Sequence, residues 1–302
     1  MPIISVVIPA YNAEQTILET LASVQNQTFS DIEIIVINDG STDRTLELVQ
    51  SVNDSRIKIF SDQNGGLPVA RNRGISYAIG ELITFIDADD LWTPDKLELQ
   101  LKVLQQHPEA SVAYSWSCLI GQEGSLLARY HPIYFQGDVY HQLLLNNFIA
   151  NGSNILVYKE AAESIGGFDS TLKSVEDWDF YLRLAAKYQF VVVPEWQILY
   201  RQSPNAMTSK VEVMEAEALK VIEKAYRNAP LQYHSLKNRS LAWIHQYCTQ
   251  QYLKNSTDLR GVQMAAHKLL TAVRFYPPIL LDAYTRNLVK WLIKRWIILM
   301  IH

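Results

Sequence analysis

The first hundred residues alternate between short apolar runs and stretches with helical periodicity, and this alternation restricts the fold more than any other feature of the sequence. Apolar runs rich in β-branched residues occupy positions 3–8, 32–37, 57–60 and 82–86. Stretches 12–27, 41–52 and 66–80 lie between these runs and carry apolar residues at helical spacing. Continuous apolar strands that alternate with helices predict a parallel sheet covered on both faces.

Several residues indicate where the predicted helices begin and end. Ser41 or Thr42 can cap the helix in 41–52, because a hydroxyl oxygen accepts a hydrogen bond from an N–H of the first turn. Gly80 is typical of a helix C-terminus. Thr93 and Pro94 predict the start of another helix after the fourth strand, as its N-cap and first-turn residues.

The pattern changes after about residue 110 and again near residue 210. Apolar runs at 111–120, 153–158 and 190–194 predict further strands, and 174–188 predicts a helix. The remainder is almost entirely helical in pattern. We therefore expect two units, residues 1–210 and 211–302, and we expect the first to divide into halves of about 1–110 and 111–210.

Charge and cysteine content argue against several classes of protein. The formal charge of −4 in 302 residues offers no basic surface for nucleic acid, so no nucleic-acid partner is expected. Cys118 and Cys248 are far apart, which argues against a disulfide framework or a zinc site and fits a reducing, cytoplasmic compartment. No secretory signal is visible, and no stretch reaches the roughly 18 apolar residues that a membrane span needs.

Polar motifs follow the predicted strands at the edge where ligands of parallel sheets bind, namely at 11–12, 38–40 and 87–90. In the last of these, Asp87, Asp89 and Asp90 directly follow an apolar run. Like charges this close raise one another's pKa, which suggests a bound cation. Carboxylate oxygens suit Mg²⁺ or Mn²⁺. The alternative is a solvated acidic loop, with Asp90 favourable near the N-terminus of the following helix.

The motifs at 38–40 and 64–74 have both a functional and a structural interpretation. Asp39 can accept hydrogen bonds from a base N–H or a ribose hydroxyl, but Asn-Asp-Gly-Ser is also turn chemistry. Arg71 and Arg73 follow the flexible Gly65-Gly66 pair, and arginine suits the recognition of phosphate. We place Arg71 in the site and interpret Arg73 as structural.

Glu176 and Asp177 stand at the start of the helix predicted in 174–188. A carboxylate held near a reacting hydroxyl can act as a general base. However, Ser174 and Asp177 also have the spacing of a capping box, so the pattern alone leaves both interpretations open. Aromatic residues of the second half are interpreted mainly as core, with sugar stacking as the alternative; they are Tyr114, Trp116, Trp178 and Trp196.

Taken together, these motifs resemble a family 2 glycosyltransferase of the GT-A fold, over roughly residues 3–210. The resemblance rests on the order of "SVVIPAYNAE", "VINDGSTD", "NGGLPVARNRGI", "FIDADD", "NGSNILV", "GGFD" and "SVEDWDFYLRL". It implies an α/β fold in which a Rossmann-like, mixed or parallel sheet is flanked by helices, followed by a C-terminal helical extension. The half at 1–110 would bind the nucleotide, and the half at 111–210 the acceptor.

The same resemblance implies a role for each matched residue. Asp89 would be the principal ligand of Mn²⁺ or Mg²⁺, and Asp177, in preference to Glu176, would be the general base. The remaining residues would bind the nucleotide: Pro9, Tyr11 and Asp39 line its pocket, Asn64 and Arg71 lie near the base and diphosphate, and Asp87 faces the ribose and the metal. Members of the family often carry a histidine where Ser203 aligns here, so the resemblance does not extend to a diphosphate contact at that position.

The expected activity is the inverting, metal-dependent transfer of a single sugar from a nucleotide-diphosphate sugar to a hydroxyl of a glycan or lipid-linked acceptor. UDP is the nucleotide implied first, with dTDP or GDP as alternatives. The Q-x-x-R-W signature of processive synthases is missing. One alternative is a non-catalytic nucleotide-sugar-binding scaffold. Another is a nucleotidyltransferase, but "PAYNAE" contains no glycine for a phosphate loop.

The last segment of the sequence is a basic amphipathic stretch. Arg286, Lys290 and Lys294 recur every four residues, which places them along one face of a helix. Such a helix with tryptophans can lie at a membrane interface, and the peripheral location at the inner face of the membrane is one expectation. The other is that this helix packs on the protein itself or on a sister subunit.

Overall fold

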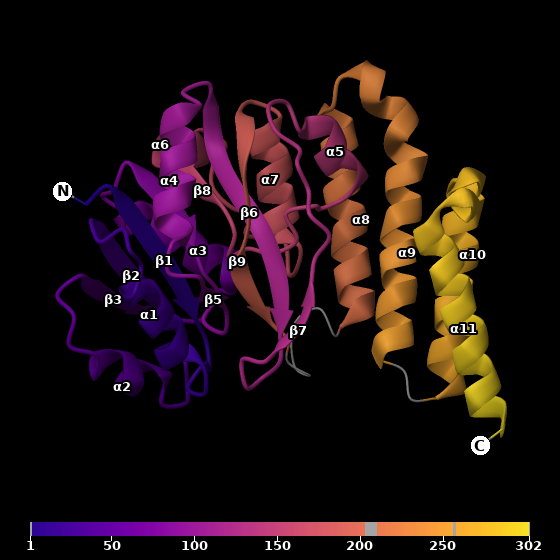
Figure 1. Ribbon diagram of the computed structural model, residues 1–302, viewed down its shortest axis with the longest axis horizontal. Helices are drawn as coiled ribbons and strands as arrows, with labels where there is room; N and C mark the ends of the chain where they lie inside the picture. Colours follow the sequence, from indigo (N-terminus) through magenta and orange to yellow (C-terminus); the bar gives the residue numbers. More distant parts are fainter. Residues whose placement is uncertain (1, 203–209, 256–257, 302) are drawn as a thin grey trace. The chain divides into compact units, whose positions relative to one another are not determined.

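The computed structural model describes residues 2–202, 210–255 and 258–301 of the chain (Figure 1). It divides into two compact units. The first unit comprises Met1–Tyr140 and Phe148–Ser203, and the second comprises His141–Asn147 and Pro204–His302. The first holds a mixed sheet with helices, and the second is helical.

Four parallel strands form the N-terminal half of the sheet, as the alternating pattern predicts. They lie in the order β3-β2-β1-β4, and β1 pairs with β2 and β4 in a register that sets Ile4 opposite both Ile32 and Leu82. Their bounds are Ile4–Ala10 for β1, Ile32–Asp39 for β2, Ile57–Asp62 for β3 and Leu82–Phe85 for β4. Strands β1, β2 and β4 are buried along their whole length, because helices cover both faces.

Opposite faces of β1 pack against different helices. Ile4, Val6 and Ile8 belong to one core cluster with residues of α1 (Ile17–Gln25) and α4 (Lys96–Gln106). On the other face, α3 (Leu67–Tyr77) lies so close that a Cβ on Gly74 would be 2.2 Å from Val7 Cγ1. Glycine at position 74 therefore allows α3 to lie directly on the sheet.

The sheet continues through strands from later in the sequence. Its order is β4-β8-β6-β9-β5, with β7 paired to β6. β8 runs antiparallel to β4 and β6, whereas β6 and β9 are parallel. The bounds are Leu91–Trp92 for β5, Ala110–Ile120 for β6, Leu126–Arg129 for β7, Leu156–Tyr158 for β8 and Gln189–Arg201 for β9. α6 (Lys159–Ser164) and α7 (Glu176–Ala185) belong to the same unit.

Strand β9 is longer than the predicted run at 190–194. Val193 pairs with Ser115, but the next pair joins Trp196 to Trp116, so Pro194 and Glu195 form a bulge. A bulge accommodates proline, which cannot donate to the strand ladder, and the strand then continues to Arg201. This extension carries Arg201 to the site described below.

The second unit consists of helices that pack on one another in sequence order. α8 contacts α9, α9 contacts α10, and α11 contacts both α9 and α10. Their bounds are Tyr140–Leu145 for α5, Val211–Asn228 for α8, Lys237–Asn255 for α9, Leu259–Phe275 for α10 and Ala283–Ile301 for α11, with short 3₁₀ turns at Leu231–Leu236 and Pro277–Leu281. None of the helices in the described ranges has the length and apolar character needed to cross a membrane.

A buried charged cluster joins three of these helices. Glu215 of α8 pairs with His245 of α9 at 2.8 Å and with Lys268 of α10 at 2.6 Å. All three side chains are largely buried, which means that removing Glu215 would leave the Lys268 ammonium without its counter-ion.

Three of the predicted helix boundaries are wrong. α2 (Thr45–Gln50) has Arg44 at its N-cap, instead of Ser41 or Thr42. α4 starts at Lys96 with Asp95 at its N-cap, two residues after the predicted Thr93-Pro94 start. α3 ends at Tyr77, and Gly80 instead approaches β1, where a Cβ would be 2.8 Å from Ser5 N.

Candidate active site

The parallel strands β1, β2 and β4 bring their carboxyl ends to one edge of the sheet. Pro9 is buried within β1, and Tyr11 beyond the strand is 54% exposed. Asp39 ends β2, and Asp87 follows β4. Residues that the sequence places at separate strand ends therefore lie along the same edge of the sheet.

Asp39 fixes the loop in front of α3. Its carboxylate accepts hydrogen bonds from Gly65 N at 2.9 Å and Gly66 N at 2.8 Å, and it pairs with Arg73 Nη1 at 2.9 Å. Gly66 has a φ of 88°, which favours glycine. Arg73, interpreted from the sequence as structural, thus contacts the carboxylate predicted to bind the nucleotide.

The same loop holds Asn64 next to the end of β2. Asn64 is exposed, and a Cβ on Gly40 would be 2.8 Å from Asn64 N. Gly40 also has a φ of 72°. Both the close approach and the backbone conformation therefore favour glycine after Asp39.

Arg71 forms the centre of the site. Its side chain is 1% exposed and pairs with Asp87 Oδ1 at 2.6 Å and with Glu176 Oε1 at 2.7 Å. Burial disfavours the charged guanidinium, but the two carboxylates outweigh this effect and raise the pKa of Arg71. A charged Arg71 therefore links the end of β4 to the start of α7.

The surroundings of Arg71 leave little room for it to move. Its guanidinium carbon lies 5.2 Å from the centre of the Phe168 ring. A Cβ on Gly152 would be 2.0 Å from Arg71 Nη2, so a larger residue at 152 would displace the arginine. The sequence predicted Arg71 near the base and diphosphate of a nucleotide; the structure pairs it with two carboxylates of the protein.

Asp89 and Asp90 are adjacent but have different environments. Asp89 is partly buried, and burial together with the charge of Asp87 raises its pKa to about 6. Asp90 is completely buried; it accepts hydrogen bonds from Ser153 Oγ at 2.5 Å and Arg201 N at 2.9 Å. Burial and the neighbouring carboxylates raise the pKa of Asp90 as well.

The expected role of Asp90 near a helix N-terminus is therefore wrong. β5 separates Asp90 from α4, and its carboxylate instead joins the loop at Ser153 to strand β9. Two hydrogen-bonded groups depend on Asp90, which makes it part of the framework beneath the site.

Arg201 is a residue whose role the sequence analysis missed. Its Nε donates to the carbonyl oxygen of Asp89 at 2.7 Å, and its Nη2 pairs with Glu19 at 2.6 Å. Its Nη1 also contacts the carbonyl oxygen of Gln122. The Tyr-Arg pair at 200–201 is the signal in the sequence that could have indicated this role, and Ser203, which follows it, lies outside the described residues.

The donor atoms at the end of β4 fit a hard divalent cation. Asp87 and Asp89 supply carboxylate oxygens, and burial of Asp89 next to a like charge favours a cation nearby. Among the described residues, no group of three or more His, Cys, Asp or Glu is arranged to hold a metal. Mg²⁺ and Mn²⁺ sites of nucleotide enzymes commonly use only one or two carboxylates and complete the shell with phosphate and water.

Helix α7 starts in a strained conformation that presents Glu176 and Asp177. Val175 at its N-cap has a φ of 54°, which is a rare conformation for a β-branched residue. The N-cap is Val175 and not Ser174, and the Val175 side chain makes no capping hydrogen bond, so the predicted capping box of Ser174 and Asp177 does not form. Asp177 Oδ1 instead accepts a hydrogen bond from Trp178 N at 2.7 Å.

The environment of Asp177 favours its protonated form. Burial and the adjacent charge of Glu176 raise its pKa to about 7, against the opposing effects of Arg71 and of the Trp178 N–H. Its helix is well anchored: Phe180 stacks on Phe168 with ring centres 4.0 Å apart, and Tyr181 Oη donates to Asn151 O at 2.7 Å. A carboxylate with a pKa near 7 can exchange a proton at physiological pH.

The aromatic residues of the second half are mainly core. Tyr114, Trp116 and Trp178 are buried, as the sequence suggested. Trp196 is partly exposed and lies under the guanidinium of Arg129, at 4.7 Å from its carbon to the ring centre.

A family model described as glycosyltransferase like family 2 matches residues 5–255. Among curated proteins, the chondroitin synthase of Pasteurella multocida is 32% identical over 192 residues, which cover 63% of this chain but 20% of the synthase. An uncharacterized glycosyltransferase of Rickettsia typhi is 32% identical over 230 residues, covering 71% of this chain and 70% of that protein. The chain thus spans about a fifth of the length of the first relative.

Solved structures share the fold over nearly the whole chain. Residues 1–349 of TarS from S. aureus give a TM-score of 0.61 at 21% identity, covering 98% of this chain and 89% of that one. TarS in complex with UDP-GlcNAc gives 0.59 at 19% identity, covering 92% and 91%. The mannosyltransferase PcManGT from Pyrobaculum calidifontis, in complex with GDP-Man and Mn²⁺, gives 0.61 at 17% identity, covering 98% and 87%.

Proposed function

This chain belongs to the glycosyltransferase-like family 2, and from that membership we propose that it transfers one sugar from a nucleotide-diphosphate sugar to a hydroxyl of a glycan or lipid-linked acceptor. Relatives named as chondroitin and hyaluronan synthases support a polysaccharide acceptor. The neighbour TarS binds UDP-GlcNAc and PcManGT binds GDP-Man, which supports a nucleotide-sugar donor. We take UDP as the first nucleotide to test.

One observation carries this proposal: a single buried arginine joins the residues assigned to the donor and to the acceptor. Arg71 pairs with Asp87 after β4 and with Glu176, the neighbour of Asp177. A transfer reaction needs a donor site and a base at one reacting centre, and this pairing holds the two segments together.

Donor binding is assigned to the first half, about residues 1–110. Pro9, Tyr11, Asp39 and Asn64 lie on β1, β2 and the loop before α3, where a nucleotide could meet the strand ends. The Asp39 carboxylate already accepts three hydrogen bonds, yet a carboxylate has about four acceptor positions, so one remains for a base or ribose. Asp87 pairs with Arg71 through Oδ1, and its Oδ2 would face the ribose.

Asp89, with Asp87 beside it, would hold Mn²⁺ or Mg²⁺. When bound, the cation would supply positive charge against the negative charge that develops on the diphosphate as it leaves. The protein's own part is to hold the Asp87–Asp89 turn in place, through Arg71 on one side and Arg201 on the other.

Asp177 is assigned as the general base of an inverting displacement, within the acceptor half at about 111–210. As the acceptor oxygen forms a bond to the anomeric carbon, its proton passes to the Asp177 carboxylate and the bond to the diphosphate oxygen breaks. The pKa near 7 suits this task, because the group then accepts a proton readily yet is half deprotonated at neutral pH.

A panel of nucleotide sugars, each with Mn²⁺ or Mg²⁺ and a set of glycan acceptors, tests the proposal by release of nucleoside diphosphate. Asp177→Asn should lower this release by about 10²–10⁴-fold. The matched control Asp31→Asn changes an exposed aspartate and should keep the wild-type rate. Donor binding without turnover, and with no effect of Asp177→Asn, would instead favour the non-catalytic nucleotide-sugar-binding scaffold.

A further inference from the structure

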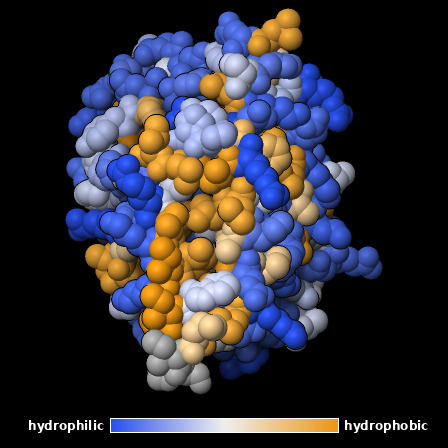
Figure 2. Space-filling view, turned by 90° about the vertical axis from the view of Figure 1, so that its right-hand side faces the viewer, coloured by the Kyte–Doolittle hydropathy of each residue, from blue (hydrophilic) through white to orange (hydrophobic). Residues whose placement is uncertain are grey.

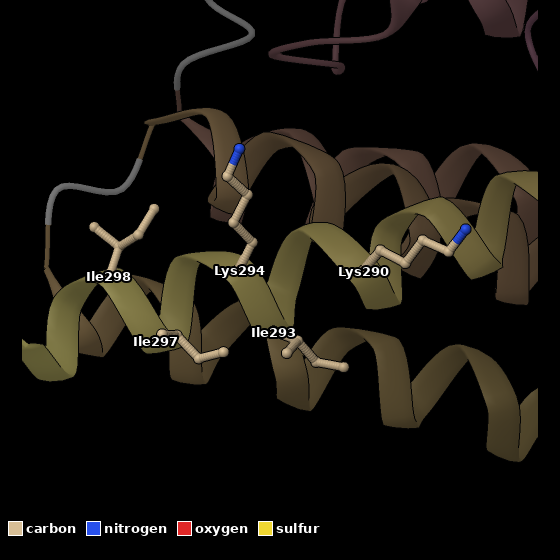
Figure 3. Close-up of a pocket in the computed structure, with 5 residues that line it drawn as sticks. All are labelled: Lys290, Ile293, Lys294, Ile297 and Ile298. Atoms are coloured by element: carbon tan, nitrogen blue, oxygen red, sulfur yellow. The ribbon is translucent and has the colours of Figure 1, made fainter.

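Helix α11 exposes an apolar strip beside a row of lysines. Five apolar residues of this helix are between 40% and 65% exposed, and four of them form the strip: Ile293, Trp296, Ile297 and Met300; the fifth, Ile298, lies on the side of the lysines (Figure 3). Figure 2 looks onto the side of the molecule that carries α10 and α11, and it shows apolar side chains gathered in a broad band there. The opposite side of α11 is buried at Thr285 and Leu288.

Lysines lie along the edge of this strip. Lys290 and Lys294, together with Ile293, Ile297 and Ile298, line a hollow of about 380 Å³. Figure 3 shows the two lysine side chains pointing to one side of α11, while Ile293 and Ile297 point to the other. All five residues belong to a single helix, so this hollow is an open amphipathic face and not an enclosed pocket.

The charge of the sequence is unevenly distributed and favours an anionic partner for this helix. Residues 211–302 contain thirteen Lys and Arg against six Asp and Glu, whereas residues 1–210 contain fourteen against twenty-five. After Asp282 the sequence has no acidic residue. Within the described part of the chain, neither Lys290 nor Lys294 has an ion-pair partner, so both charges remain available.

We propose that this face of α11 docks on the surface of an anionic lipid bilayer. Ile293, Trp296, Ile297 and Met300 would enter the boundary between headgroups and acyl chains, and Lys290 and Lys294 would lie at the level of the lipid phosphates. A helix with an apolar face, bordering lysines and a tryptophan has the composition of an interfacial helix. The proposal does not depend on the transfer reaction, since an inactive chain would dock equally well.

Docking on a second copy of this chain fits the same face less well. A twofold contact through α11 would place Lys290 and Lys294 of one copy against the same patch of the other. The helix has no carboxylate with which to compensate them, so like charges would meet. Anionic lipids supply the missing negative charge and also an apolar layer.

Co-sedimentation of the full chain with vesicles tests the proposal, using phosphatidylcholine alone and phosphatidylcholine mixed with phosphatidylglycerol. Lys290→Gln/Lys294→Gln should lower the partition on the anionic vesicles by about fivefold per lysine, because each cation near such a surface contributes about that factor. Ile293→Ser/Ile297→Ser should lower it by about tenfold per isoleucine, since about half of each side chain leaves water on docking.

Matched controls change the same chemistry elsewhere on the helical unit. Lys210→Gln/Lys254→Gln removes two exposed lysines, one at the N-cap of α8 and one in α9, and Leu231→Ser removes an apolar side chain that is 84% exposed. Neither control should change the partition by more than about twofold, since surface substitutions away from such a face have small effects. Brominated acyl chains should quench wild-type tryptophan fluorescence more than that of Trp296→Phe.

Three outcomes would overturn the proposal. The first is that the chain fails to sediment with anionic vesicles or sediments equally with neutral ones. The second is that the control pair of lysines lowers the partition as much as Lys290→Gln/Lys294→Gln. The third is that light scattering shows a dimer that Ile293→Ser/Ile297→Ser dissociates, with no binding to vesicles by the wild type.

Discussion

Arg71 and Glu176, 105 residues apart in the sequence, form a buried ion pair at 2.7 Å. The same guanidinium pairs with Asp87 at 2.6 Å, so one side chain fastens the start of α7 to the end of β4. Arg71 thereby holds the segment with the proposed base, at the start of α7, next to the segment with the proposed donor ligands, at the end of β4. Substitutions at this pair should therefore affect both stability and activity.

Arg71→Met should lower the free energy of unfolding by about 3–5 kcal/mol, because it leaves two carboxylates near a buried site without their cation. Glu176→Gln should cost less, since an amide oxygen can still accept a hydrogen bond from Arg71 Nη1. Urea denaturation measures both. Equal losses for the two variants, or a loss of less than about 1 kcal/mol for Arg71→Met, would contradict a central role of this pairing.

Asp177→Asn should lower kcat by about 10²–10⁴, the usual contribution of a general base, while the affinity for the nucleotide sugar stays within about twofold. The amide cannot take up the proton of the acceptor hydroxyl, but it keeps the size of the carboxylate. Initial rates of nucleoside diphosphate release and titration calorimetry with the donor separate the two effects. A rise in the donor dissociation constant that matches the fall in kcat would assign Asp177 to binding instead.

The rate should fall as the pH drops below about 7, because Asp177 must be deprotonated to act as a base. Glu176 raises the pKa of Asp177, so Glu176→Gln should move this acid limb of kcat/KM to lower pH. Asp31→Asn should leave it in place. An acid limb that does not move in Glu176→Gln would mean that another group titrates.

The raised pKa of Asp177 should also make the stability of the fold depend on pH. The pKa of Asp177 in the folded state lies above its ordinary value of 3.8, so folding favours the protonated carboxyl. This contribution is fully present below about pH 4 and is lost as the pH rises through about 7. Asp177→Asn should therefore be less sensitive to pH in this window than the wild type, as measured by thermal unfolding across the range.

Asp89→Ala and Asp90→Ala make the same change at adjacent positions and should have opposite consequences. Asp90→Ala leaves Ser153 Oγ and Arg201 N without their acceptor and should cost about 1–3 kcal/mol of unfolding free energy. Asp89→Ala removes a carboxylate that burial and Asp87 destabilise, so above pH 6 the fold should be no less stable. Its effect should be on catalysis: nucleoside diphosphate release should no longer respond to added Mn²⁺. If Mn²⁺ stimulates Asp89→Ala as strongly as the wild type, Asp89 is not a metal ligand.

The strands were predictable because parallel strands that are buried on both faces consist of continuous apolar residues, which are visible in the sequence. Helix starts were less predictable, since the expected caps are used in contacts between loops. Ser41 Oγ accepts a hydrogen bond from Asn12 N, and Thr42 N donates to Asn12 Oδ1. Thr93 N donates to the carbonyl oxygen of Gln197 on β9. Each of these contacts joins residues that are distant in the sequence, so a local pattern cannot reveal it.

The location of the site at the strand ends could be predicted from the topology, but the ion pairs between its side chains could not. Spacing placed Asp39, Asp87 and Asp89 at the ends of neighbouring strands, whereas nothing in the local sequence indicates that Arg73 pairs with Asp39 or that Arg71 pairs with Glu176. Asp90 shows the same limit: Asp87, Asp89 and Asp90 look alike in the sequence, and only the structure shows that Asp90 is completely buried.

The sheet order β4-β8-β6-β9-β5 also determines when the site can be completed during synthesis. Strands β1 to β4 leave the ribosome before the other strands of this sheet, but the edge of β4 stays unpaired until residues 156–158 have been made. Asp90 stays without its partner on β9 until residue 201 has been made. Translation of about two thirds of this chain must therefore precede assembly of the acidic turn, and a nascent chain stalled before that point would present an unpaired strand edge to chaperones.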